Sequence, residues 1–270
     1  MKVAGWSVVG LTVAFAPAHA AQSDLVDLKH AMMEVAYRGD LDSLEAIAST
    51  FTRLAPNHPD GSLAYYHAGF ARFVLALMRG PNGLDSMAGD PARMLAQVDS
   101  GIAHLETAVT SRSDFADAMA LLAHLYSMKI RADPRVAPSA GPRARALLSQ
   151  ALAREPNNPR VALIDAMRLF WAPADRGGNR ESGIDRWREA IGLFAMEIDD
   201  PTSAAPSWGL AEAWAWLPAA YLALEKPDTA AAREAARRAI EVRPDFRWIR
   251  VSLLPRVDAA IDRERARKDR

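Results

Sequence analysis

The side chains that could carry acid–base or metal chemistry are few in this chain and far apart in its sequence. There is no cysteine, which excludes disulfides, thiolate metal sites and a cysteine nucleophile. No two histidines beyond residue 20 lie three or four positions apart, the spacing that puts two metal ligands on one face of a helix. These histidines are His30, His58, His67, His104 and His124. We therefore expect no metal site and no cofactor.

The motifs that usually mark an enzyme are also missing from the sequence. It contains no glycine-rich phosphate loop, no Gly-x-Gly-x-x-Gly and no Gly-x-Ser-x-Gly. Asp199 and Asp200 form a carboxylate pair, but Pro201 follows directly, which is typical of a solvated loop. Gly177 and Gly178 precede a predicted helix; their amides could hold an anion, although a turn that needs positive φ explains them as well. The sequence predicts a protein that is not an enzyme.

The composition indicates a helical protein with a substantial core. Hydrophobic residues make up 50% of the 270 residues, and 54 residues are alanine, the strongest helix former. Lys plus Arg and Asp plus Glu both number 33, so no excess of charge attracts nucleic acid or an anionic membrane. We expect an all-α fold and no nucleic-acid partner.

The N-terminus has the layout of a secretory signal peptide. Lys2 supplies a positive charge, residues 3–16 form an apolar stretch, and Ala18-His19-Ala20 places small residues before a cleavage point. The apolar stretch has 14 residues, fewer than the roughly 20 that span a bilayer. We predict cleavage after Ala20, a periplasmic or secreted location, and no membrane span in the mature chain.

Beyond residue 20, almost every stretch has the pattern of a helix, and sustained strand alternation is absent. Clusters of Pro, Gly, Asn and Asp separate the helical blocks. The predicted helices are 24–37, 41–54, 62–78, 91–111, 115–131, 142–154, 159–170, 180–198, 210–224, 229–242 and 247–267. The long loops are expected at 80–90, 127–141, 171–179 and 199–208.

Several of these helices end in the same way. An alanine is followed five positions later by Pro or Ser, then by a short Asp/Asn segment and another helix. The alanines are Ala108, Ala151 and Ala239, with Ala190 as a fourth copy. The terminal residues are Ser113, Pro156 and Pro244. Small residues at such positions let two helices approach closely, so the pattern indicates an internal repeat of helix pairs.

The repeat resembles the tetratricopeptide repeat (TPR) family, and within it an exported bacterial variant with long inter-helix loops. The resemblance implies antiparallel helix pairs stacked in a right-handed superhelix, a short α-solenoid. The anchor alanines are 43, 39 and 49 residues apart, and the loops account for the excess over the family unit of about 34. We therefore divide the chain into a signal peptide (1–20), an N-terminal helical pair that is a degenerate or capping repeat (21–59), a TPR-like domain (60–255) and a charged C-terminal helix or tail (256–270).

The tryptophans gather in the last part of this repeat region. Apart from Trp6, all lie between Trp171 and Trp248, and the others are Trp187, Trp208, Trp214 and Trp216. We favour packing between helices, with each indole N–H bonded to a partner. An aromatic ligand pocket is the alternative.

A TPR-like superhelix binds on its concave face, which the first helix of each pair lines. The repeat register places there Tyr66, Phe70, Asp117, His124, Arg160, Met167 and Glu212. This mixture of aromatic, thioether and charged groups suits an extended peptide or a small organic ligand. Arg160 begins a helix and is expected to be held by the backbone rather than by a salt bridge. The alternative for the two aromatic residues is a place in the core.

These observations together predict a non-enzymatic protein-interaction or scaffold protein of the bacterial cell envelope. Its partner would be a peptide or protein bound in the concave groove. A solute-binding accessory subunit of a transport system is the alternative, and a small-molecule ligand belongs to that alternative.

Overall fold

The computed structural model describes residues 16–80, 90–198 and 200–269, with side chains from residue 24 onward. Over these ranges the chain is all-α, with eleven α-helices and no strand. The helices are α1 (Ala16–Arg38), α2 (Leu41–Leu54), α3 (Gly61–Arg79), α4 (Pro91–Ser111), α5 (Ala116–Ala132), α6 (Ala137–Arg154), α7 (Pro159–Trp171), α8 (Arg180–Met196), α9 (Leu210–Leu222), α10 (Thr229–Val242) and α11 (Leu254–Lys268).

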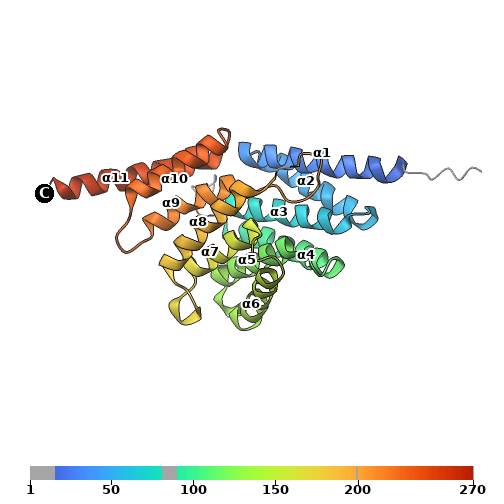
Figure 1. The fold of residues 1–270 in the computed structure, drawn as a ribbon, viewed down its shortest axis with the longest axis horizontal. Helices are drawn as coiled ribbons and strands as arrows, with labels where there is room; N and C mark the ends of the chain where they lie inside the picture. The colour runs from blue at the N-terminus through green and yellow to red at the C-terminus, as the bar shows by residue number, and fades with distance from the viewer. Residues whose placement is uncertain (1–15, 81–89, 199, 270) are drawn as a thin grey trace, which may run out of the picture.

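Consecutive helices pack as antiparallel pairs along the chain. The most extensive contacts are between α3 and α4, α5 and α6, α7 and α8, and α9 and α10. Figure 1 shows α1, α2 and α3 side by side at one end, while α11 carries the C-terminus away at the other. This is the arrangement of helix pairs that the repeat pattern predicts.

The Asp and Asn residues between helices act as N-caps, which is why the helices begin where they do. Asn158 accepts hydrogen bonds from the backbone N–H of Arg160 (2.9 Å) and Val161 (3.1 Å), and Pro159 occupies the first turn. A cap of this kind provides a hydrogen-bond acceptor for backbone amides that have no partner within the helix. A proline in the first turn loses no helical hydrogen bond, because its N–H would have had no partner. The same role falls to Asp40, Asp90, Asn179 and Asp228.

The small residues of the repeat lie where helices touch. Ala108, Ala151, Ala190 and Ala239 are all completely buried. Gly183 in α8 is equally constrained, because a Cβ atom there would lie 2.8 Å from the backbone nitrogen of Phe170 in α7. Close approach of backbones therefore requires a small residue at these positions.

Two predicted helices begin earlier in the structure: α1 begins at Ala16 rather than at residue 24, and α6 begins at Ala137 rather than at residue 142. The predicted loop 127–141 is mostly helical, because α6 begins at Ala137 and accommodates Pro142 in its second turn. The predicted helix 247–267 is confirmed as one continuous helical stretch, in which Ile249–Leu253 forms a π-helical turn directly before α11. Pro255 lies in the first turn of α11 and has no N–H to donate to the preceding turn. The π-helical turn lies directly before it.

Most of the predicted signal peptide and the loop 80–90 lie outside the described residues. The described part begins with α1, so cleavage after Ala20 would remove the first five residues of that helix. Among the described residues, none of the helices has both the length and the apolar character needed to cross a membrane.

Candidate functional site

The seven residues predicted to line the concave groove are all buried. None exposes more than 8% of its surface, and Tyr66 and Phe70 are core residues. Tyr66, Phe70 and Arg160 contact Trp208 of residues 200–209, which we call the crossing segment and which connect α8 to α9. The protein's own chain therefore occupies this part of the predicted groove.

The backbone of the crossing segment is held by side chains from two distant helices. Lys29 Nζ of α1 donates to the carbonyl oxygen of Ser203 at 2.6 Å. The Nε2 atom of His67 in α3 lies 2.7 Å from the carbonyl oxygen of Ala204. Burial lowers the pKa of His67 to about 4, so this imidazole is neutral at physiological pH and Nε2–H donates to the carbonyl. An extended segment without internal helical bonds needs such partners for its buried carbonyls.

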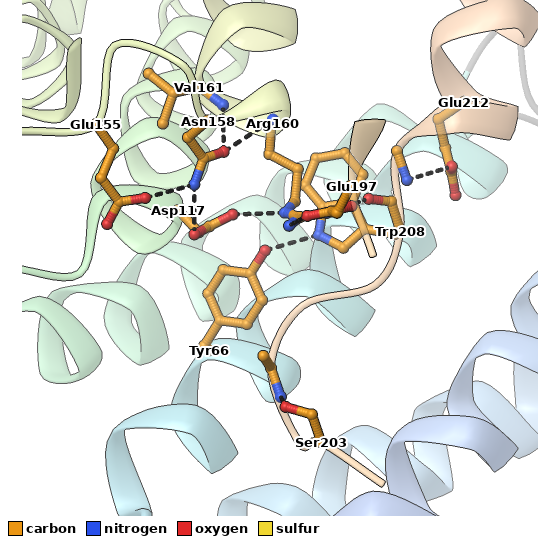
Figure 2. A network of polar contacts seen from close by, with 12 residues as sticks. Tyr66, Asp117, Glu155, Asn158, Arg160, Val161, Glu197, Ser203, Trp208 and Glu212 are labelled. Atoms are coloured by element: carbon orange, nitrogen blue, oxygen red, sulfur yellow. Dashed lines mark hydrogen bonds and ion pairs between the residues drawn. The ribbon is translucent and has the colours of Figure 1, made fainter. Parts of the chain in front are cut away.

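The ring of Trp208 fixes the end of the crossing segment (Figure 2). Its Nε1–H donates to the hydroxyl oxygen of Tyr66 at 2.7 Å, and its ring stacks on Phe70 with centroids 4.8 Å apart. Burial, together with the charge of Asp117, raises the pKa of Tyr66 well above its ordinary value, so the hydroxyl stays protonated. These two residues therefore hold the protein's own tryptophan instead of a partner's side chain.

Arg160 is the centre of the polar network in Figure 2, and the expectation that the backbone alone holds it is wrong. Its Nε donates to Asp117 at 2.6 Å, Nη1 donates to the Trp208 carbonyl oxygen at 3.0 Å, and both terminal nitrogens contact Glu197. Burial alone would lower the pKa of Arg160, but the two carboxylates outweigh it and raise the pKa. Asn158 completes the network by donating to Asp117 at 3.0 Å.

Glu212 also has an internal role. It accepts hydrogen bonds from the Gly209 N–H at 2.8 Å and from the Tyr37 hydroxyl at 2.9 Å. Burial raises its pKa, and these bonds oppose the rise. Gly209 has φ +134°, and a Cβ there would lie 2.0 Å from the ring of Phe194, so only glycine fits at this turn.

The remaining two predicted residues, His124 and Met167, line a pocket that the sequence did not reveal. It lies between α5, α6, α7 and the turn after α7, and has a volume of about 180 Å³. Leu148, Ile164 and Trp171 contribute to its apolar wall. The pocket exists because α5 packs against both α6 and α7, whereas α6 and α7 contact each other only slightly.

Four arginines surround this pocket, and we call it the arginine-rimmed pocket. They are Arg131, Arg145, Arg168 and Arg176, and no acidic residue lines it. Arg168 is paired with Asp165 at 2.9 Å. The other three are exposed and have no hydrogen bond or ion pair with any residue that the structure describes. Although Arg131 is exposed as a residue, its guanidinium is partly desolvated, which lowers its pKa, and no carboxylate opposes that effect.

The tryptophans divide between the two roles considered for them. Trp187 and Trp208 are buried and bonded: Trp187 Nε1 donates to the Ala213 carbonyl oxygen at 3.0 Å. Trp171 is instead 40% exposed and lines the arginine-rimmed pocket. In a chain with 28 arginines and five lysines, the arginines that complete the pocket carried no recognisable signal.

The other candidate groups form no reactive cluster. Within the described ranges, no three His, Cys, Asp or Glu side chains come close enough to hold a metal ion. Asp199 lies outside those ranges, and Asp200 caps a turn by accepting from the Thr202 N–H at 2.9 Å. Gly177 has φ +81°, which confirms the turn predicted for the pair of glycines.

The fold defines the class: an all-α protein built of consecutive antiparallel helix pairs. No protein-family model matches the chain, and no curated protein matches it. Among solved structures it is similar to the HusA haemophore from Porphyromonas gingivalis, with a TM-score of 0.55 and 20% sequence identity. The alignment covers 81% of this chain and 98% of the haemophore. At this level of identity the likeness shows a common fold.

Proposed function

We propose that this chain is a non-enzymatic binding protein whose ligand is a small amphipathic organic anion held in the arginine-rimmed pocket. The observation that carries the proposal is the presence of three arginines without partners around an apolar pocket that no acidic residue lines. A guanidinium pairs with a carboxylate or phosphate through two parallel hydrogen bonds. The apolar wall would hold the rest of the molecule away from water.

The volume limits the size of that ligand. A cavity of about 150 Å³ is enough for benzene, whereas sites for drug-sized molecules have roughly 300–1,000 Å³. With about 180 Å³, the pocket suits a single ring or a short aliphatic chain whose anionic group stays at the rim.

Haem is the second candidate, because the similar solved structure is a haemophore. A whole porphyrin exceeds the volume of the pocket, so it would have to lie across the mouth with its carboxylates on the arginines. His124 and Met167 line the same pocket, but its volume of about 180 Å³ leaves no room for a porphyrin beside them. A small anion fits inside the pocket, so we rank it ahead of haem.

A peptide in the concave groove needs a larger rearrangement still. The crossing segment would have to leave, which breaks the bonds that Arg160, Tyr66 and His67 make to it. We therefore rank a scaffold function behind small-molecule binding. Export after cleavage at Ala20 and descent from TPR units remain part of the proposal, and the N-terminal layout and the repeat pattern support them.

Calorimetric titration with octanoate, 3-phenylpropionate and its neutral amide tests the proposal. We expect at least one acid to bind and the amide of 3-phenylpropionate to bind at least about tenfold more weakly than its acid, the scale of one charged anchor. The double variant Arg131→Gln with Arg145→Gln should reduce acid binding similarly. Arg237→Gln, an exposed arginine of α10, is the matched control and should change nothing.

Two results would contradict this function. One is that neither acid binds the unaltered protein. The other is that the Arg131 and Arg145 double variant binds as well as the Arg237 control. A parallel titration with haemin, followed by its Soret absorbance, separates the second candidate from the first. Saturable haemin binding without acid binding would favour the tetrapyrrole.

A further inference from the structure

Three histidines are buried among the described residues, His58, His67 and His124, and only His124 lines the arginine-rimmed pocket. His124 is 5% exposed, lines the pocket, and makes no hydrogen bond to any described residue through either ring nitrogen; its Nε2 atom is completely buried. His67 also has a buried nitrogen without a partner, Nδ1, but its Nε2 contacts the Ala204 carbonyl oxygen, whereas neither nitrogen of His124 is bonded to a described residue. The only ring neighbour of His124 among the described residues is Phe73, at 5.4 Å between centroids. A buried polar group without a protein partner is uncommon and calls for a ligand or another explanation.

The chemical state of this imidazole restricts what could bond to it. Burial and the charge of Arg131 lower the pKa of His124 to about 3. The ring is therefore neutral at physiological pH, with one nitrogen as a donor and the other as an acceptor. A neutral hydroxyl group, which can donate or accept, matches either nitrogen.

The spacing of polar groups on α5 sets the distance between the two ends of the ligand. His124 and Arg131 are seven residues apart, two helical turns on the same face, and both line the pocket. At 1.5 Å per residue this corresponds to about 10 Å along the helix axis. The apolar side chains of Leu148, Ile164 and Met167 belong to the wall of the same pocket. The imidazole and the guanidinium thus belong to one apolar pocket, whose volume of about 180 Å³ has space for about one six-membered ring.

We infer that the ligand is a hydroxylated aromatic carboxylate, with its ring against the apolar wall, its carboxylate on the arginine rim and its hydroxyl group on His124. This inference rests on the proposed function and names the ligand class for the same pocket. His124 is then the residue that determines specificity for the hydroxyl group, while the arginines supply affinity for the anion. A site built to bond a hydroxyl discriminates against the analogue that lacks it, because its own polar group is otherwise left unpaired.

A matched pair of acids tests this inference. We expect 3-(4-hydroxyphenyl)propionate to bind the unaltered protein about tenfold more tightly than 3-phenylpropionate. In His124→Leu the preference should disappear, while the affinity for 3-phenylpropionate stays within about twofold. The ¹⁵N shifts of the His124 ring in the unaltered protein supply a second measurement, which needs no substitution. They should move with the hydroxylated acid and stay constant with its partner.

The outcomes separate this inference from the proposed function. Equal binding of the two aromatic acids, both weakened in the Arg131 and Arg145 double variant, overturns the role of His124 and leaves the anion pocket standing. If octanoate binds and neither aromatic acid does, the inference that the ligand is aromatic is overturned, while the anion pocket stands. If none of the three acids binds, the anion pocket itself is refuted. Should His124→Leu fail to fold, constant ¹⁵N shifts on saturation with the hydroxylated acid are enough to reject the inference.

Discussion

Replacement of Arg160 by methionine should destabilise the protein strongly, because this one side chain joins the crossing segment to two pairs of helices. Its side chain is 6% exposed. It bonds to Asp117 of α5, to Glu197 after α8 and to the carbonyl oxygen of Trp208. Methionine fills a similar volume but supplies no donor.

The size of the effect follows from what the substitution leaves behind. Removal of one partner from a buried ion pair costs roughly 3–5 kcal/mol, because the other charge stays buried. Asp117, whose side chain is 10% exposed, would keep only the hydrogen bond from Asn158. Glu197 is 32% exposed and can regain water, which places the expected loss near the lower limit, about 3 kcal/mol. For a chain of this size that corresponds to a fall in Tm of roughly 6–12 °C.

Urea unfolding followed by circular dichroism, together with thermal melts, measures this loss. Arg237→Met is the control: this arginine is also paired with two carboxylates, but on the exposed face of α10, and its loss should leave Tm unchanged. Adding Asp117→Asn to Arg160→Met should restore part of the stability, because it removes the unpaired charge. Equal melting temperatures for Arg160→Met and Arg237→Met would refute the argument that the network holds the crossing segment.

Two further predictions concern packing and pH. Gly183→Ala should destabilise the protein, because the added Cβ meets the backbone of Phe170. Gly192→Ala in the same helix is the control: its added Cβ has nothing within 4 Å, and it should stabilise the protein by about 0.5–1 kcal/mol. A Gly183 variant as stable as the Gly192 variant would contradict the close contact of α7 and α8. Burial lowers the pKa of His67 to about 4, so above pH 6.5 this side chain is neutral in both the folded and the unfolded chain. As the pH falls from about 6.5 towards 4, only the unfolded chain takes up the proton. The free energy of unfolding should therefore fall by up to about 3 kcal/mol over this range. His67→Gln should remove about one proton from the slope of unfolding free energy against pH. An unchanged slope in this variant would show that His67 titrates normally.

Local sequence determined the helices and their limits with few errors. The bounds of α2, α4 and α10 coincide with the predicted ranges, because Asp40, Asp90 and Asp228 stand before them as caps. The pattern of small residues located the close contacts between helices, since only a short side chain allows two backbones to approach. Both are properties of residues near one another in the chain.

The face of a helix that looks inward was also predicted, but its accessibility was not. The register predicted that Tyr66, Phe70 and Arg160 line an open groove, whereas all three are buried, and nothing in their spacing showed that the crossing segment would contact them. That segment is about 140 residues from Tyr66 in sequence and is attached by bonds such as Trp208 to Tyr66. Its path depends on long-range pairing of buried carbonyls and rings, which local periodicity does not encode.

What the sequence by itself determined is therefore the helical class, the helix ends and the tight contacts, all of which depend on short-range propensity and capping. Only the tertiary structure decided where a ligand could bind. The crossing segment occupies part of the predicted groove, and the open pocket arises where α6 separates from α7 beside α5. The arginines around it come from three helices and a turn, so their common surroundings exist only after those elements have packed.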